Sequence, residues 1–232
     1  MMKKILHGLL SLATLWFLSA CGGGGNVSTL PTQVNRVALV SLSVNDWGGS
    51  VKSGSVGSEG TEELIYSGLG EMVAYTEQKL AGKWQVKKVA DFIGRPEYRA
   101  LGVERTLTAY LPKISGQEMP IFTKVSKELK SGSISPDLAK QLCAALEVDA
   151  VALVFSEWTV KTGGIVPTTK AVSKNIITLW DSNGRKIFNK RVDMMGTRSL
   201  GAFGFKAMNR DTVLEWTDTF KRSLDQIFSG MA

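Results

Sequence analysis

The fold of this 232-residue chain is decided by the run Val148-Asp149-Ala150-Val151-Ala152-Leu153-Val154-Phe155. From Ala150 onward the run is wholly apolar, which is typical of a strand that is buried on both faces. Shortly before it, Ser135-Pro136-Asp137 combines a capping serine, a proline suited to the first helical position and an acidic first turn. A helix that leads directly into a doubly buried strand predicts an α/β layer.

Segments on the amino-terminal side supply further elements of this layer. Residues 36–44 begin as a continuous apolar run and end in alternation, which predicts a first central strand. Apolar residues at helical spacing predict a helix over residues 61–81, and alternation predicts a second strand over residues 84–92. A proline then favours a helix over residues 97–110, while the pattern of residues 121–129 is ambiguous.

The carboxyl-terminal side adds a hairpin and a last helix. Strands over residues 172–181 and 185–192 are joined by Asn183-Gly184, the strongest short hairpin signal. Residues 194–207 contain three glycines among apolar side chains and predict a loop. Apolar residues then recur every three or four positions from residue 209 to about residue 228, which predicts a C-terminal helix.

The first 20 residues have the pattern of a secretory signal peptide. Lys3 and Lys4 form a basic start, and an apolar run from Ile5 to Phe17 follows. This run is too short for a stable transmembrane helix, which needs about 20 predominantly apolar residues.

Leu18-Ser19-Ala20-Cys21 follows the apolar run and resembles the bacterial lipobox at every position. The resemblance implies cleavage between Ala20 and Cys21, thioether attachment of a diacylglycerol to the Cys21 sulfur and acylation of the new amino terminus. Residues 21–35 are then a lipidated tether of flexible composition. Enteric-type bacteria sort lipoproteins between the two membranes by the residue after the lipidated cysteine. Glycine and not aspartate at position 22 resembles the residue choice of lipoproteins sent to the outer membrane. The alternative is that Cys21 is an ordinary cysteine near the signal.

The remaining residues, 36–232, are predicted to form a single α/β domain. It has a central mixed sheet of about four to five strands, flanking helices and a C-terminal helix. The chain contains 44% hydrophobic and 21% charged residues, which is sufficient for a core. The net charge of +7 falls to +5 without Lys3 and Lys4, and the basic residues are spread out. We therefore expect no nucleic-acid partner, but a weak attraction to anionic lipid or cell-wall polymer.

Residue types that the mature chain lacks narrow its chemistry. The only histidine, His7, lies in the signal peptide, which argues against imidazole-based catalysis and metal binding. With Cys21 lipidated, Cys143 is the sole free thiol and is expected to be a small buried hydrophobe. The sequence therefore predicts no catalytic residue, no metal site and no cofactor.

Two local motifs resemble a group of bacterial envelope α/β domains. The first is the passage from helix to strand through Val148-Asp149-Ala150, and the second is the hairpin turn Asp181-Ser182-Asn183-Gly184-Arg185. The group includes the curli-secretion lipoprotein, the amino-terminal domain of the Tol-system propeller protein and lipoprotein activators of penicillin-binding proteins. The resemblance covers about residues 36–228 and implies an α/β fold that binds partners. Residues 161–171 are too short to match the membrane hairpins of the secretion channel, so no pore is expected.

These observations favour a lipid-anchored, periplasm-facing outer-membrane adaptor that is not an enzyme and binds another envelope protein. Its expected partner surface lies on residues 45–60 or on residues 196–205, and the candidate apolar side chains are Trp47, Leu200, Phe203 and Phe205. One alternative is a small-ligand or lipid carrier. Another is a carboxylate-dependent envelope enzyme, for which Glu157 at the end of the apolar strand is the best candidate.

Overall fold

A five-stranded mixed sheet forms the centre of the computed structural model, which describes residues 34–46, 61–104, 109–202 and 210–231. The strand order is β2-β1-β5-β6-β7. β1 is parallel to β2 and to β5, whereas the β5–β6 and β6–β7 pairs are antiparallel. The predicted fold class, a mixed sheet with flanking helices and a C-terminal helix, is confirmed. The strands are β1 (Arg36–Asp46), β2 (Gln85–Lys87), β5 (Ala150–Gly163), β6 (Thr168–Asp181) and β7 (Lys186–Ala202).

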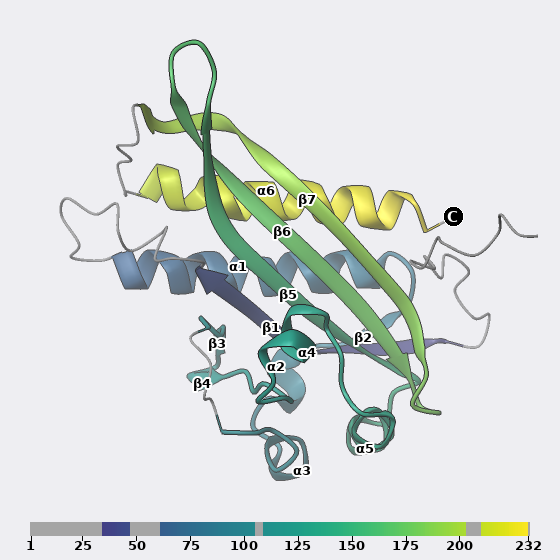
Figure 1. The fold of residues 1–232 in the computed structure, drawn as a ribbon. Coiled ribbons are helices and arrows are strands. Elements are labelled where there is room, and N and C mark those ends of the chain that lie inside the picture. Colours follow the sequence, from purple (N-terminus) through teal and green to yellow (C-terminus); the bar gives the residue numbers. More distant parts are fainter. Residues whose placement is uncertain (1–33, 47–60, 105–108, 203–209, 232) are drawn as a thin grey trace, which may run out of the picture.

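Helices cover both faces of this sheet. α1 (Thr61–Ala81) and α6 (Arg210–Ser229) run side by side across one face (Figure 1). The rings of Trp158 of β5 and Trp216 of α6 stack where this helix meets the sheet, with centroids 5.9 Å apart. On the other face, the backbone carbonyl of Gly132 accepts hydrogen bonds from the Thr178 hydroxyl and the Trp180 indole of β6. Shorter elements complete the fold: α2 (Val89–Phe92), α3 (Pro96–Arg99), α4 (Ser126–Lys130), α5 (Pro136–Leu146), β3 (Lys113–Ile114) and β4 (Gln117–Glu118).

The strand that organises the sequence is the middle strand of the sheet. Val151 has no exposed surface, and the apolar run from Ala150 to Phe155 is buried along its length. Ser135 caps α5 by accepting a hydrogen bond from the Leu138 amide at 3.2 Å, as the sequence predicts. α5 then ends in a left-handed Glu147, and the chain enters β5.

Asp149, the residue between α5 and β5, ties the start of β1 to this corner. Its carboxylate accepts hydrogen bonds from the backbone amides of Asn35 and Arg36, at 2.9 and 2.8 Å. Its own carbonyl accepts the amide of Ser182 in the β6–β7 turn, at 2.9 Å. The described chain therefore enters the fold at the end of the sheet that carries this turn.

The predictions for residues 84–92 and 97–110 are largely wrong. Only Gln85–Lys87 is a strand, and Val89–Phe92 turns into α2, because Val89 and Phe92 are buried at helical spacing. In the described part of the second segment, residues 97–104 and 109–110, only the end of Pro96–Arg99 is helical, because the chain beyond it turns to pair Val103 with Ile121. Farther along, Tyr110 exchanges backbone hydrogen bonds with Val44 of β1. The ambiguous residues 121–129 contain the start of α4.

The two hairpin strands are longer than the sequence predicts. β6 begins at Thr168, and β7 continues to Ala202, so the loop predicted over residues 194–207 is wrong as far as residue 202. The rest of that loop, and residues 47–60, lie outside the described residues. The Asn183-Gly184 turn itself is confirmed, with Gly184 at a φ of +78°.

Candidate functional site

The β5–β6 hairpin projects beyond the rest of the molecule (Figure 1). Its two strands of 14 residues pair without interruption from Ala150–Asp181 to Gly163–Thr168. The hairpin thus starts at the corner where the chain enters the fold and ends at the opposite end of the sheet. We call the turn of residues 163–168 the hairpin tip.

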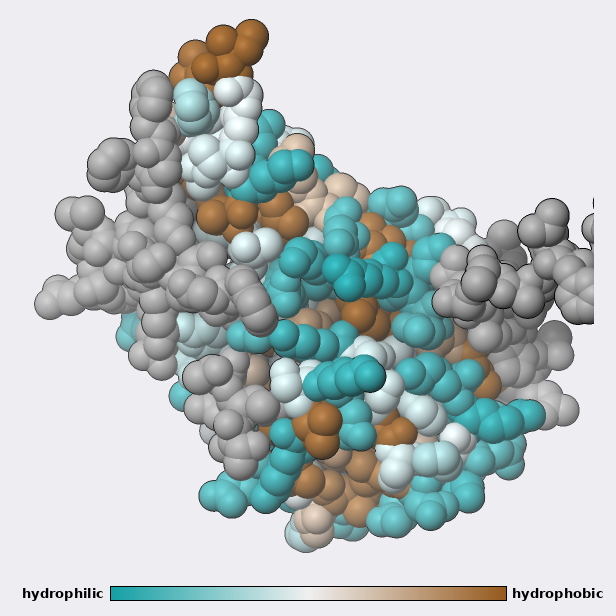
Figure 2. Space-filling view, in the orientation of Figure 1, coloured by the Kyte–Doolittle hydropathy of each residue, from teal (hydrophilic) through white to brown (hydrophobic). Residues whose placement is uncertain are grey.

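The hairpin tip is apolar and exposed. Ile165 is fully exposed, at 105% of its reference surface, and Val166 is 60% exposed. Figure 2 shows this hydrophobic cap separated from the hydrophobic residues of the body. Two neighbouring aliphatic side chains in this position gain nothing from the core of their own domain, which makes the tip a candidate contact surface.

The strands directly behind the tip are basic. Lys161 and Lys170 are register partners, and Thr162 and Thr169 between them and the tip join their hydroxyls at 3.0 Å. The sequence contains no aspartate or glutamate from residue 158 to residue 173. The hairpin end therefore combines an apolar cap with positive charge.

β7 forms one edge of the sheet. It pairs with β6 on one side, and among the described residues no strand pairs with its other side. The edge is 17 residues long, and Met195 on it is 47% exposed. The unpaired amides and carbonyls of such an edge are a template for another strand.

Glu215 of α6 fixes the far part of this edge strand. Its buried carboxylate, 3% exposed, accepts hydrogen bonds from the backbone amides of Thr197 and Arg198, at 2.6 and 3.0 Å. The contact needs glycine at position 196, where a Cβ atom would lie 2.7 Å from the Glu215 oxygen. β7 bulges here, between its pairings at Met195 and Ser199. Glu215 could not be identified from the sequence, because at 100° per residue it lies nearly opposite the apolar stripe of the helix, which consists of Val213, Trp216, Phe220, Leu224 and Ile227.

Of the four side chains predicted to form the partner surface, the structure describes only Leu200, and for this residue the prediction is wrong. That side chain is only 3% exposed, because β7 continues through it and turns it toward the core. Trp47, Phe203 and Phe205 lie outside the described residues, as do the signal peptide and Cys21. The described residues that flank the two segments, Asp46 and Ala202, are at the hairpin end of the sheet, paired with Trp158 and Thr168.

Glu157, the candidate for carboxylate chemistry, is engaged in an ion pair. It lies on β5 opposite Lys174, whose ammonium group donates a hydrogen bond to it at 2.6 Å. The Glu157 side chain is 12% exposed and that of Lys174 is 36% exposed, so the carboxylate is largely covered while its partner reaches solvent. The two charges compensate each other, which gives Glu157 a structural role.

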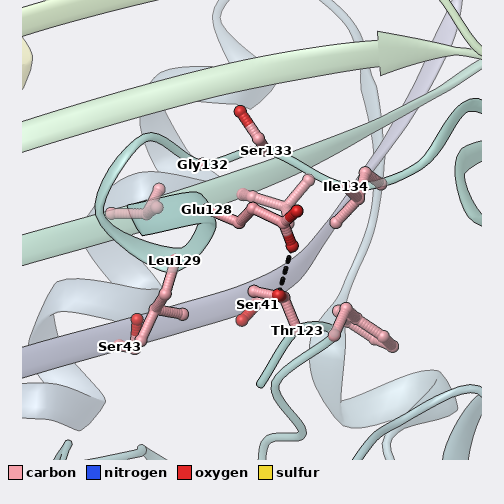
Figure 3. A pocket seen from close by; sticks show the side chains of 11 residues that line it. Ser41, Ser43, Thr123, Glu128, Leu129, Gly132, Ser133 and Ile134 are labelled. Atoms are coloured by element: carbon pink, nitrogen blue, oxygen red, sulfur yellow. Dashed lines mark hydrogen bonds between the residues drawn. The ribbon is translucent and has the colours of Figure 1, made fainter. Parts of the chain in front are cut away.

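A small cavity lies between β1 and the segment that contains α4 (Figure 3). Hydroxyl groups of Ser41 and Ser43 line it, and Thr123 donates a hydrogen bond to Glu128 at its side. Its free volume is about 10 Å³, which is room for about one water molecule. A wider hollow of about 290 Å³ has a polar surface lined by Arg99, Glu104 and Glu118, unlike the apolar lining of most small-ligand sites.

Cys143 lies in α5 among buried residues and is 2% exposed. Burial, together with the nearby carboxylates of Asp181 and Asp149, raises the pKa of its thiol to about 12. The thiol therefore stays protonated near neutral pH, as expected for a small buried hydrophobe.

Comparisons with known proteins give structural similarity alone. No protein-family model matches the chain, and no curated protein sequence matches it. The structure of the hypothetical protein CT253 from Chlamydia trachomatis is similar, with a TM-score of 0.38, 16% identity and coverage of 86% of this chain and 98% of that one. The lipoprotein GNA1162 from Neisseria meningitidis gives a TM-score of 0.37, 11% identity and coverage of 84% and 99%. Similarity at this level assigns neither a family nor an activity to the chain.

Among the residues that the structure describes, no helix combines the length and hydrophobicity that a membrane span requires.

Proposed function

We propose that this chain is a lipid-anchored, periplasm-facing adaptor of the bacterial outer membrane that is not an enzyme and binds another envelope protein. The lipobox Leu18-Ser19-Ala20-Cys21 supports the anchor, and the Gly-rich residues that follow support a tether. The contacts of Asp149 with Asn35 and Arg36 give that tether a fixed attachment point on the domain.

The observation that carries the adaptor proposal is the exposed edge of β7. An extended segment of a partner can add to this edge through main-chain hydrogen bonds, with side-chain contacts such as Met195 giving specificity. The bulge held by Glu215 limits the regular part of the edge to the stretch before Gly196. A second irregularity lies between Lys186 and Phe188, so the proposed partner contact is on residues 188–195.

The lipid anchor is tested by Cys21→Ser. Serine lacks the thiolate needed for thioether formation, so we expect an unprocessed precursor or a soluble species in cell fractions. A processed variant that stays in the membrane fraction through salt washing, as the parent does, would contradict the lipoprotein assignment.

The edge contact is tested by photo-crosslinking in intact cells. A photoreactive amino acid at Met195 is expected to give a discrete adduct with one envelope protein. The matched control is the same amino acid at Val125, which is 51% exposed, compared with 47% for Met195, but lies next to α4. Equal adducts at both positions, or none at Met195, would contradict partner binding at β7.

A further inference from the structure

We propose that the hairpin tip is a second membrane contact, which inserts shallowly into an anionic lipid surface. This contact is separate from the lipid at Cys21 and from the partner edge of β7. It goes beyond the proposed function, because an adaptor of this kind needs only one attachment to the membrane.

Side chains along the hairpin follow the order of chemical groups in a bilayer interface. Ile165 and Val166 form the apolar end, the exposed Thr162, bonded to the buried Thr169, follows, and the Lys161–Lys170 pair lies behind it. At about 3.3 Å per residue, the lysines lie roughly 10 to 13 Å behind the tip. Apolar groups of interfacial elements reach about 5 to 10 Å into the boundary of headgroups and acyl chains. The lysines would then lie at the level of the phosphate groups.

Charge favours anionic lipid over other apolar surfaces. Glu157, the nearest carboxylate before the basic pair on β5, is neutralised by Lys174 at 2.6 Å. Arg198 on the neighbouring strand is ion-paired with Glu215 at 4.0 Å, so the positive charge behind the tip is that of Lys161 and Lys170. Positive charge around an apolar cap complements a layer of negatively charged headgroups.

The dimensions allow the lipid anchor and the tip to meet the same membrane. β5 has 14 residues, which span about 45 Å between the entry corner of the chain and the hairpin tip. Residues 22–33 can span up to about 40 Å when extended. With this reach, the domain lies along the membrane, with Cys21 attached near one end of the sheet and the tip at the other.

The test uses the full-length lipidated protein, reconstituted into phosphatidylcholine vesicles with or without phosphatidylglycerol. An environment-sensitive fluorophore is attached through Ile165→Cys, at a side chain that makes no buried contacts. On phosphatidylglycerol vesicles we expect blue-shifted emission and quenching by nitroxide-labelled lipid. The same fluorophore on Val125→Cys, exposed to 51% but away from the hairpin, should stay in water.

Lysine substitutions test the electrostatic part. Lys161→Gln and Lys170→Gln, made in the labelled protein, should each lower the ratio of inserted to withdrawn tip about fivefold on phosphatidylglycerol vesicles. Aqueous emission at position 165 on both vesicle types would overturn the proposal. So would a blue shift that requires an added envelope protein, because it would assign the tip to a protein partner. Failure of crosslinking at Met195 would leave this readout unchanged, so the two proposals are tested separately.

Discussion

Val151→Ala tests whether the apolar run at the start of β5 is the core of the fold. The Val151 side chain has no exposed surface on the middle strand of the sheet. Losing two methyl groups costs about 1.6 kcal/mol in transfer free energy, at about 0.8 kcal/mol for each. The cavity left behind adds about 1 kcal/mol, because packed neighbours relax only in part. We expect a loss of about 2 to 3 kcal/mol in the free energy of unfolding.

The matched control is Val166→Ala, the same chemical change at a side chain that is 60% exposed on the hairpin tip. Its free energy of unfolding should stay within about 0.5 kcal/mol of the parent. Urea unfolding followed by tryptophan fluorescence measures both, since the Trp158–Trp216 stack is buried in the native state. For a domain of this size the Val151 variant should also melt about 4 to 12 °C lower. Equal destabilisation by both changes, or a parental midpoint for Val151→Ala, would refute this assignment of core and surface.

Three further predictions concern the corner at which the chain enters the sheet. Gly184→Ala should lower the free energy of unfolding by more than about 2 kcal/mol, because φ is +78° and the new Cβ would lie 2.5 Å from the carbonyl oxygen of Pro136. A urea midpoint equal to that of the parent would contradict this. Burial opposes ionisation of Asp181, but hydrogen bonds from Arg185 outweigh it and hold the pKa of the carboxyl below its usual value. The ionised Asp181 carboxylate should therefore contribute fully to the free energy of unfolding above about pH 4, and this contribution should be lost as the pH falls through the lowered pKa. The urea midpoint of Asp181→Asn should change less with pH than that of the parent. Equal slopes for the two proteins would argue against this role. Native Cys143, with a thiol pKa of about 12, should not react with a thiol reagent at pH 8 until the protein unfolds, and labelling at the rate of a free cysteine would show that it is accessible.

Elements with strong local signals could be predicted from the sequence. The Ser135-Pro136-Asp137 start of α5, the apolar run of β5 and the Asn183-Gly184 turn each depend on neighbours within a few residues, and each is confirmed. The helix predicted over residues 61–81 is also present, as α1.

Elements that depend on distant residues were missed. β7 continues past Gly196 because Glu215, far along the chain in α6, binds the amides of the bulge. This extension of β7 buries the Leu200 side chain. It also places Gly196 and Gly201, two of the glycines from which a loop was predicted, within a strand. Likewise, the ends of β5 and β6 are polar, and no local pattern predicts that they pair as far as Gly163 and Thr168.

The projecting tip was missed for a related reason. Ile165 and Val166 are ordinary apolar residues in the sequence, and only the length of the pairing behind them shows that they are carried away from the core. An interaction surface of this kind is defined by exposure, which sequence patterns do not report directly.

The parallel pairing of β1 with β5 has a mechanical consequence for a protein held at both ends. Tension between the membrane anchor and the hairpin tip would pull β1 backward from Arg36 and β5 forward toward Gly163. Neighbouring strands drawn in opposite directions along their axes load their hydrogen bonds together, from the pairing of Val37 with Ala150 to that of Asp46 with Trp158, on both sides of the irregularity between Leu39 and Ser41. Such a shear load is shared by the whole interface, whereas a peeling load breaks one bond after another. A domain attached to the membrane at these two points would therefore resist tension along β1 and β5 better than one whose strands are peeled apart.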